Sequence, residues 1–216
     1  MPGMIDPLQL IFIMSAAAIL PFLAVVATSF IKLSVVFFLV RHAIGVQNIP
    51  PNMALNALAL ILSGYIMAPV AMQTREILAV GNYSFETVEG LHAAYEAAKQ
   101  PMLDFLTRHA ADREKMFFLQ AAKELWPESM SSTLDMQSLA VVLPSFTVTQ
   151  LREAFEIGFL LYLPFIIIDL VVSNILLAMG MMMVSPLTIS LPFKLFLFVM
   201  IDGWSRLILG LVTGYA

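Results

Sequence analysis

The chain of 216 residues is 60% hydrophobic and 12% charged, whereas soluble globular domains average about 45–50% and 25%. Its mean hydropathy of +0.90 predicts large apolar surfaces that a bilayer or other subunits must cover, which excludes an ordinary soluble monomer. The net charge of −4 offers no basic surface for nucleic acid, and the absence of cysteine excludes disulfides and thiolate chemistry.

The N-terminal third, residues 1–72, predicts an apolar helical hairpin. Residues 8–31 and 52–74 are uncharged, and each run exceeds the ~20 residues that a helix needs to cross hydrocarbon. Two prolines before Asn52 predict a turn, with the second helix beginning at Pro51 or Asn52. The first run is longer than the apolar part of a signal peptide and follows no basic leader, so we expect it to be retained.

Residues 73–146 predict a small, polar helical subdomain. One apolar face has three- and four-residue spacing, which indicates one amphipathic helix, or two broken at Pro101. Its members are Leu91, Tyr95, Ala98, Met102, Phe105 and Leu106. A second apolar cluster runs over residues 116–126 and stops at Pro127. The distribution of Lys and Arg favours the periplasmic side for this subdomain and the cytoplasm for both short turns.

Residues 147–216 predict a second apolar hairpin that turns near residues 180–192, giving an all-α protein with two hairpins around a polar subdomain. Thr147 and Gln150 have capping-box spacing, so the third long helix is expected to begin near Val148. Prolines and single charges such as Lys32 and Asp169 interrupt the apolar runs. Such interruptions favour helices packed against protein, although ordinary lipid exposure remains the alternative.

The sequence contains no convincing catalytic arrangement, so we expect neither an enzyme nor a cofactor. Glu89, His92 and Glu96 have the i, i+3, i+7 spacing of one helix face and could hold a metal, but a solvated face is the favoured interpretation. No Gly-rich phosphate loop and no Gly-x-Ser-x-Gly motif occurs.

Four charges stand in the C-terminal apolar region: Asp169, Lys194, Asp202 and Arg206. Such residues mark ion paths in transporters, but buried pairs also fix how helices assemble, and assembly is the favoured interpretation. Asp202 and Arg206 have the i, i+4 spacing of a helical pair.

The most unusual segment is the methionine triplet Met181, Met182 and Met183 between Gly180 and Pro186, with Pro192 following. Glycine permits a backbone break and proline prevents helix continuation, so the triplet is expected on a turn. Flexible thioethers could form a ring that seals a pore around passing chains, whereas core filling is the ordinary interpretation.

These motifs resemble the SctR/FliP family, the export-gate subunit of type III secretion systems and bacterial flagella. The resemblance is carried by residues 41–52, 67–70, 143–155, 163–171, 180–186, 189–195 and 198–204, and it spans nearly the whole chain. Val184-Ser185-Pro186, where flagellar members more often have two prolines, favours the virulence injectisome branch. Flagellar relatives commonly carry glutamate where this chain has Gln150, which puts in doubt an ionic subunit contact between that position and Lys194.

The resemblance implies five copies that assemble with SctS-like and SctT-like subunits into a protein-conducting channel for unfolded substrate proteins. It further implies contacts with SctU-like and SctV-like components, with the needle and inner-rod base, and with membrane lipid. The location implied is multi-pass in the bacterial inner membrane, with the complex raised to the periplasmic side. Met181, Met182 and Met183 then form the pore gasket, and Gly180, Pro186 and Pro192 shape its loop.

Two other hypotheses remain at this point. The chain could be a small ion or proton transporter that uses Asp169 and Lys194, or a scaffold that nucleates assembly without lining a pore. The first predicts loss of ion coupling with an intact oligomer when Asp169 is neutralised. The second predicts that substrate never touches the methionine triplet.

Overall fold

The computed structural model describes residues 14–15, 18, 22, 25–81, 83 and 88–216, and every regular element among them is a helix. The predicted all-α fold is therefore confirmed. In chain order the helices are α2 (Phe30–Ile44), α3 (Asn52–Val80), α4 (Val88–Arg108), α5 (Asp112–Leu125), α6 (Glu128–Ser131), α7 (Leu139–Ala178), α8 (Pro186–Met200) and α9 (Gly203–Thr213).

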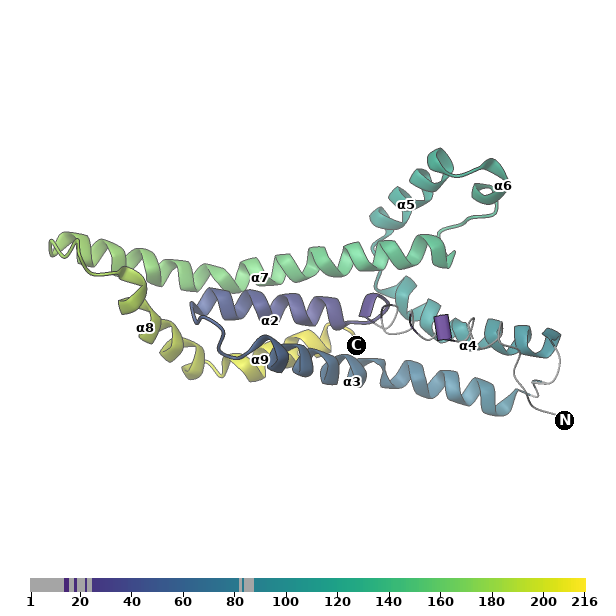
Figure 1. Ribbon diagram of the computed structural model, residues 1–216, viewed down its shortest axis with the longest axis horizontal. Coiled ribbons are helices and arrows are strands. Elements are labelled where there is room, and N and C mark those ends of the chain that lie inside the picture. Colours follow the sequence, from purple (N-terminus) through teal and green to yellow (C-terminus); the bar gives the residue numbers. More distant parts are fainter. Residues whose placement is uncertain (1–13, 16–17, 19–21, 23–24, 82, 84–87) are drawn as a thin grey trace.

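The molecule is elongated, with helix α7 running along much of its length (Figure 1). Helix α2 lies between α7 on one side and α3 and α9 on the other, and α8 and α9 fold back from the far end of α7. Helix α4 runs beside α3, while α5 and α6 project from the opposite side of α7. The polar helices α4, α5 and α6 thus lie at one end of the rod and the α7–α8 turn at the other, and α3 extends along α4 to the polar end.

Helix α2 forms the centre of the core. Leu33, Val36 and Phe37 are fully buried, and Val40 is nearly so, because α2 is surrounded by helices on several sides. Each such side chain contributes about 1.5–3 kcal/mol of burial free energy. The fold of the hairpins therefore depends mainly on this short helix.

The first arm of the N-terminal hairpin is described only in part. The described arm is α2, which is 15 residues long and begins at Phe30, whereas most of the uncharged run 8–31 lies outside the described residues. The second arm begins at Asn52, as predicted, and continues to Val80 through Pro69. The described hairpin therefore consists of a short buried helix and a long exposed one.

The polar subdomain is helical, as predicted. Helix α4 continues through Pro101 as one helix, and Phe105 and Leu106 of the predicted face are buried. At the other end of α4 the predicted face is shifted, because Ala94 is buried and Tyr95 is 58% exposed. Helix α5 ends one residue before Trp126.

Helix α7 begins at Leu139, so the predicted start near Val148 is wrong. The hydroxyl of Thr147 donates to the carbonyl of Leu143 one turn earlier (3.0 Å), and Ser145 and Thr149 make the same kind of bond. These residues bond the preceding turn instead of capping a new helix. As a result α7 runs without a break through the predicted domain boundary at 146/147, and the division into 1–72, 73–146 and 147–216 stays a prediction.

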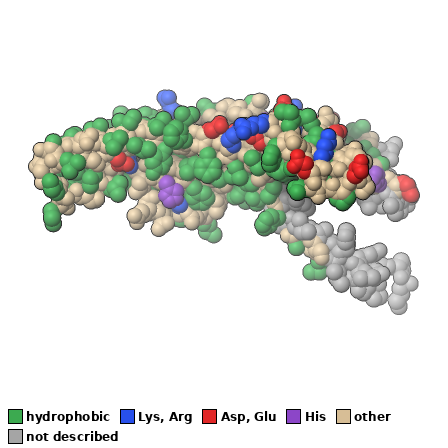
Figure 2. Space-filling model, turned by 90° about the horizontal axis from the view of Figure 1, so that it is seen from above, with side chains coloured by type: hydrophobic (Ala, Val, Ile, Leu, Met, Phe, Trp, Pro, Cys, Tyr) green, Lys and Arg blue, Asp and Glu red, His purple; other side chains and the backbone are tan. Residues whose placement is uncertain are grey.

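Large apolar surfaces remain exposed. Helices α3 and α7 are long and apolar enough to cross a membrane, and α8 with α9 forms a third candidate, bent by 58°. Figure 2 shows hydrophobic side chains over much of one face, with charged side chains gathered more toward the end that carries the polar helices. Such surfaces are stable only against lipid or other protein chains.

Candidate functional site

The turn that follows α7 places the methionine triplet. Gly180 has φ +73°, its N–H donates to the carbonyl of Leu177 (3.0 Å), and the N–H of Met181 donates to the carbonyl of Leu176 (2.9 Å). This pair of bonds is the Schellman motif, in which a left-handed residue ends the helix, and glycine adopts that conformation without strain. Gly180 therefore fixes where α7 stops and the turn begins.

The triplet lies on the turn, as predicted, at the tip of the α7–α8 hairpin (Figure 1). Met181 is 47%, Met182 83% and Met183 99% exposed. Pro186 occupies the first turn of α8, where its missing N–H costs no helical hydrogen bond. Pro192 lies inside α8 and not in the turn, which is thus shorter than the range 180–192 expected from sequence.

Asp169 and Lys194 are brought together from α7 and α8. The ammonium of Lys194 lies 2.6 Å from Asp169 Oδ2 and donates to the carbonyl of Ala43 in α2 (3.4 Å). Ser190 donates its hydroxyl to the other carboxylate oxygen of Asp169 (2.6 Å). Lys194 is 4% exposed and the Asp169 side chain 30%. The pair therefore connects α2, α7 and α8. Each of its two charged groups also has a further polar partner within the chain.

Asp202 and Arg206 lie at the bend between α8 and α9. Asp202 has φ +55° and occupies the N-cap position of α9 without a side-chain capping bond, and the N–H of Arg206 donates to its carbonyl (3.1 Å). Among the described residues neither side chain has an ion-pair partner, so the i, i+4 pair suggested by the spacing does not form within the chain. An added Cβ on Gly203 would lie 2.3 Å from the Phe198 ring, so this bend requires glycine.

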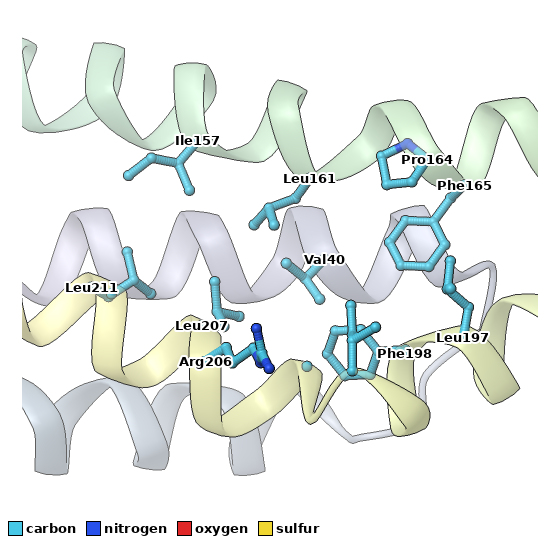
Figure 3. A pocket seen from close by; sticks show the side chains of 13 residues that line it. Val40, Ile157, Leu161, Pro164, Phe165, Leu197, Phe198, Arg206, Leu207 and Leu211 are labelled. Carbon is cyan, nitrogen blue, oxygen red and sulfur yellow. The ribbon is translucent and has the colours of Figure 1, made fainter.

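An apolar groove of about 600 Å³ lies beside this bend, between α2, α7, α8 and α9. Figure 3 shows Leu161 and Phe165 of α7 facing Leu207 and Phe198 across it, with the guanidinium of Arg206 near the wall formed by α9. The groove is lined almost entirely by apolar side chains. It gives the α8–α9 bend a surface that can receive side chains of another helix.

Gln150 is buried within the chain. It is 1% exposed, its amide donates to the carbonyl of His109 (3.2 Å), and its oxygen accepts a hydrogen bond from the hydroxyl of Tyr215. Lys194, to which the resemblance relates this position, has Asp169 as its partner instead. Gln150 therefore ties the last residues of the chain to α4 and α7.

Neighbouring groups complete a buried polar cluster at this junction. Lys32 pairs with Glu153 (2.7 Å) and lies over the ring of Tyr215, 4.7 Å from its centroid. Burial, followed by the charges of Arg108 and Lys32, lowers the pKa of His109 below its ordinary value, and the Glu153 carboxylate opposes this shift. Burial raises the pKa of the Tyr215 hydroxyl. Both side chains are thus neutral near pH 7.

Sequence reasoning missed Glu153, His109 and Tyr215 as members of this cluster. Of the cluster members, only Lys32 was indicated by the sequence, because a single cation in an apolar run needs an anion nearby. Its partner stands 121 residues away, and nothing in the sequence selects Glu153 over the other carboxylates.

The three residues considered as a metal site lie on a solvent-exposed face of α4 in the described part of the chain. Glu89, His92 and Glu96 are exposed on α4, and Glu96 pairs with Lys99 (2.5 Å). The Lys99 contact lowers the pKa of the Glu96 carboxyl, as expected for an ion pair in solvent.

The chain is similar to known proteins over nearly its whole length. The FliP family pattern matches residues 13–211. The chain is 53% identical to the Yop proteins translocation protein R of Yersinia pestis, over 97% of each chain. It is 47% identical to the hypersensitivity response secretion protein HrcR of Ralstonia nicotianae, over 96% of each, and 46% identical to the virulence protein YscR of Salmonella typhimurium, over 98% of each.

Proposed function

The chain belongs to the FliP family, and from this premise we propose that it is a subunit of the export gate of an injectisome type III secretion system. One observation carries the proposal: identity of 46–53% extends over nearly the full length of relatives named for translocation and virulence. The methionine turn is an independent physical reason, because it leaves flexible thioethers uncovered at the tip of a hairpin. The chain is a membrane protein and a component of the secretion apparatus.

We infer that the gate acts passively. In an assembly of several copies, methionine turns that converge on one axis close a narrow opening with deformable side chains. An unfolded substrate of any sequence displaces them as it passes, and they close again behind it. The energy for transport then comes from other components, since the chain carries no nucleotide-binding motif.

The partners proposed for this gate are five copies of the chain with SctS-like and SctT-like subunits. SctU-like and SctV-like components and the needle and inner-rod base adjoin the assembly. We place the complex in the bacterial inner membrane as a multi-pass assembly raised toward the periplasm. The apolar groove at the α8–α9 bend and the exposed faces of α3 and α7 supply the surfaces for these contacts.

Permeability of cells that carry the assembled complex tests the gasket. Replacing Met181, Met182 and Met183 together by alanine removes the side chains that close the opening, so leakage of ions and small solutes should rise. A matched variant replaces three exposed methionines elsewhere, Met14, Met116 and Met130, and should leave leakage unchanged. Equal leakage from both variants, with assembly intact, would remove the gasket from the account.

A further inference from the structure

A polar pocket of about 320 Å³ lies at the loop between α2 and α3, apart from the methionine turn. It is lined by Arg41, His42, Gly45, Val46, Gln47 and Asn48. Arg41 is 5% exposed, and its Nη1 donates to the carbonyl of Pro50 (3.0 Å) and to Asn52 Oδ1 (2.6 Å). Its Nε is buried and has no hydrogen-bond partner among the described residues.

The charge of Arg41 is not neutralised within the described part of the chain. None of the ion pairs there includes it, although the other buried cations, Lys32, Lys115 and Lys194, each have a carboxylate. The ring of Phe38, 5.1 Å from the guanidinium carbon, is a weak substitute. A buried cation with a free donor beside a polar pocket is costly unless an anion enters from outside.

The position of the loop indicates which kind of anion occupies the pocket. Helix α3, which is long and apolar enough to cross a membrane, begins at Asn52 directly after the loop. The start of such a helix lies where hydrocarbon gives way to phospholipid head groups. Ile49 follows the pocket residue Asn48 and Met53 lies in the first turn of α3, and they are 71% and 82% exposed. Large apolar side chains are thus exposed close in sequence to the pocket, as they are in proteins that bind at a membrane surface.

We propose that this pocket binds the phosphate group of an anionic phospholipid. The guanidinium of Arg41 supplies charge-assisted hydrogen bonds to the phosphate oxygens, and the exposed side chains of His42 and Asn48 form the rim. Ile49 and Met53 lie among the upper acyl carbons. This site is separate from the export function, because its occupant is a lipid and not a substrate protein.

Native mass spectrometry of the full-chain oligomer tests the site. The oligomer is released from vesicles of phosphatidylglycerol mixed with phosphatidylcholine, and retained lipids are counted and titrated. We expect preferential retention of phosphatidylglycerol, and Arg41→Gln should weaken it by about tenfold, the usual loss for a hydrogen bond to a charged group. Arg75→Gln removes one exposed positive charge near the other end of α3 and should leave retention unchanged.

A second pair of variants keeps the test valid if Arg41→Gln does not fold. Gln47→Glu adds a negative charge to the pocket rim without touching the partners of Arg41, and should repel the phosphate. Gln73→Glu adds the same charge on the exposed surface near the far end of α3 and should have no effect. Retention that is unchanged in both Arg41→Gln and Gln47→Glu would overturn the proposal.

Two other outcomes would also overturn it. If inorganic phosphate protected the wild-type oligomer against dissociation as well as phosphatidylglycerol does, the pocket would be assigned to a soluble anion. An oligomer that dissociates on Arg41→Gln to the same extent in pure phosphatidylcholine would assign Arg41 to a carboxylate of a second copy.

Discussion

The ion pair between Asp169 and Lys194 yields a prediction about how the α7–α8 hairpin is held. Asp169→Asn removes the carboxylate charge and leaves the Lys194 ammonium, 4% exposed, with only uncharged acceptors, the side-chain amide oxygen at position 169 and the Ala43 carbonyl at 3.4 Å. Breaking a buried pair in this way costs about 3–5 kcal/mol. Because Asp169 is 30% exposed, we expect the lower end, about 3 kcal/mol.

The reverse change should cost less. In Lys194→Met the remaining carboxylate keeps the hydroxyl of Ser190 and its partial exposure, so we expect a loss of about 1 kcal/mol. The double variant, which has neither charge, should be about as stable as Lys194→Met alone, because the stranded ammonium is gone.

Denaturant unfolding of the purified chain in detergent measures these differences. Trp204 is a suitable fluorescence reporter, since it packs against Phe198 and Phe37 with centroid distances of 5.4 and 6.2 Å. Glu96→Gln, which breaks an exposed pair, is the matched control and should have no measurable effect. Equal stability of Asp169→Asn and this control would refute the reasoning.

If Asp169→Asn left the oligomer intact but abolished ion coupling, the transporter hypothesis would be favoured instead.

Three further predictions use the same unfolding assay. Gly180→Ala should cost about 1 kcal/mol because alanine is strained at φ +73°, whereas Gly64→Ala in the interior of α3 should be neutral or stabilising; equal effects would contradict the role of the turn. Gly203→Ala should cost about 1–3 kcal/mol because its Cβ meets the Phe198 ring at 2.3 Å, and a variant as stable as Gly64→Ala would contradict this. The pKa of His109 is lowered on folding, so its contribution to stability is fully present above pH 6.5 and is lost as the pH falls toward the folded pKa. His109→Gln should flatten that decline, and an unchanged pH profile would count against it.

The parts of the fold that depend on local chemistry could be predicted from sequence. Gly180 and Pro186 bound the methionine turn because a left-handed residue ends one helix and a ring nitrogen begins the next. Asn52 begins α3 for a similar reason, after two prolines. Such signals depend only on the backbone preferences of a few consecutive residues.

Features that depend on distant partners could not be predicted in the same way. Thr147 and Gln150 have the spacing of a capping box, yet Thr147 bonds the preceding turn and Gln150 bonds Tyr215 and His109, so α7 begins earlier. The sequence likewise identified Asp169 and Lys194 as charges in need of partners, but only the fold pairs them with each other.

A single cysteine at position 182 tests the central claim most directly, since the chain has no cysteine of its own. In the assembled complex, Met182→Cys copies that converge on one axis should be joined by a short bis-maleimide into cross-linked multimers, and a substrate stalled in the gate should block the reaction. If Met182→Cys gave no cross-linked species and reacted only with a lipid-soluble maleimide, the triplet would face lipid and the gate account would be contradicted.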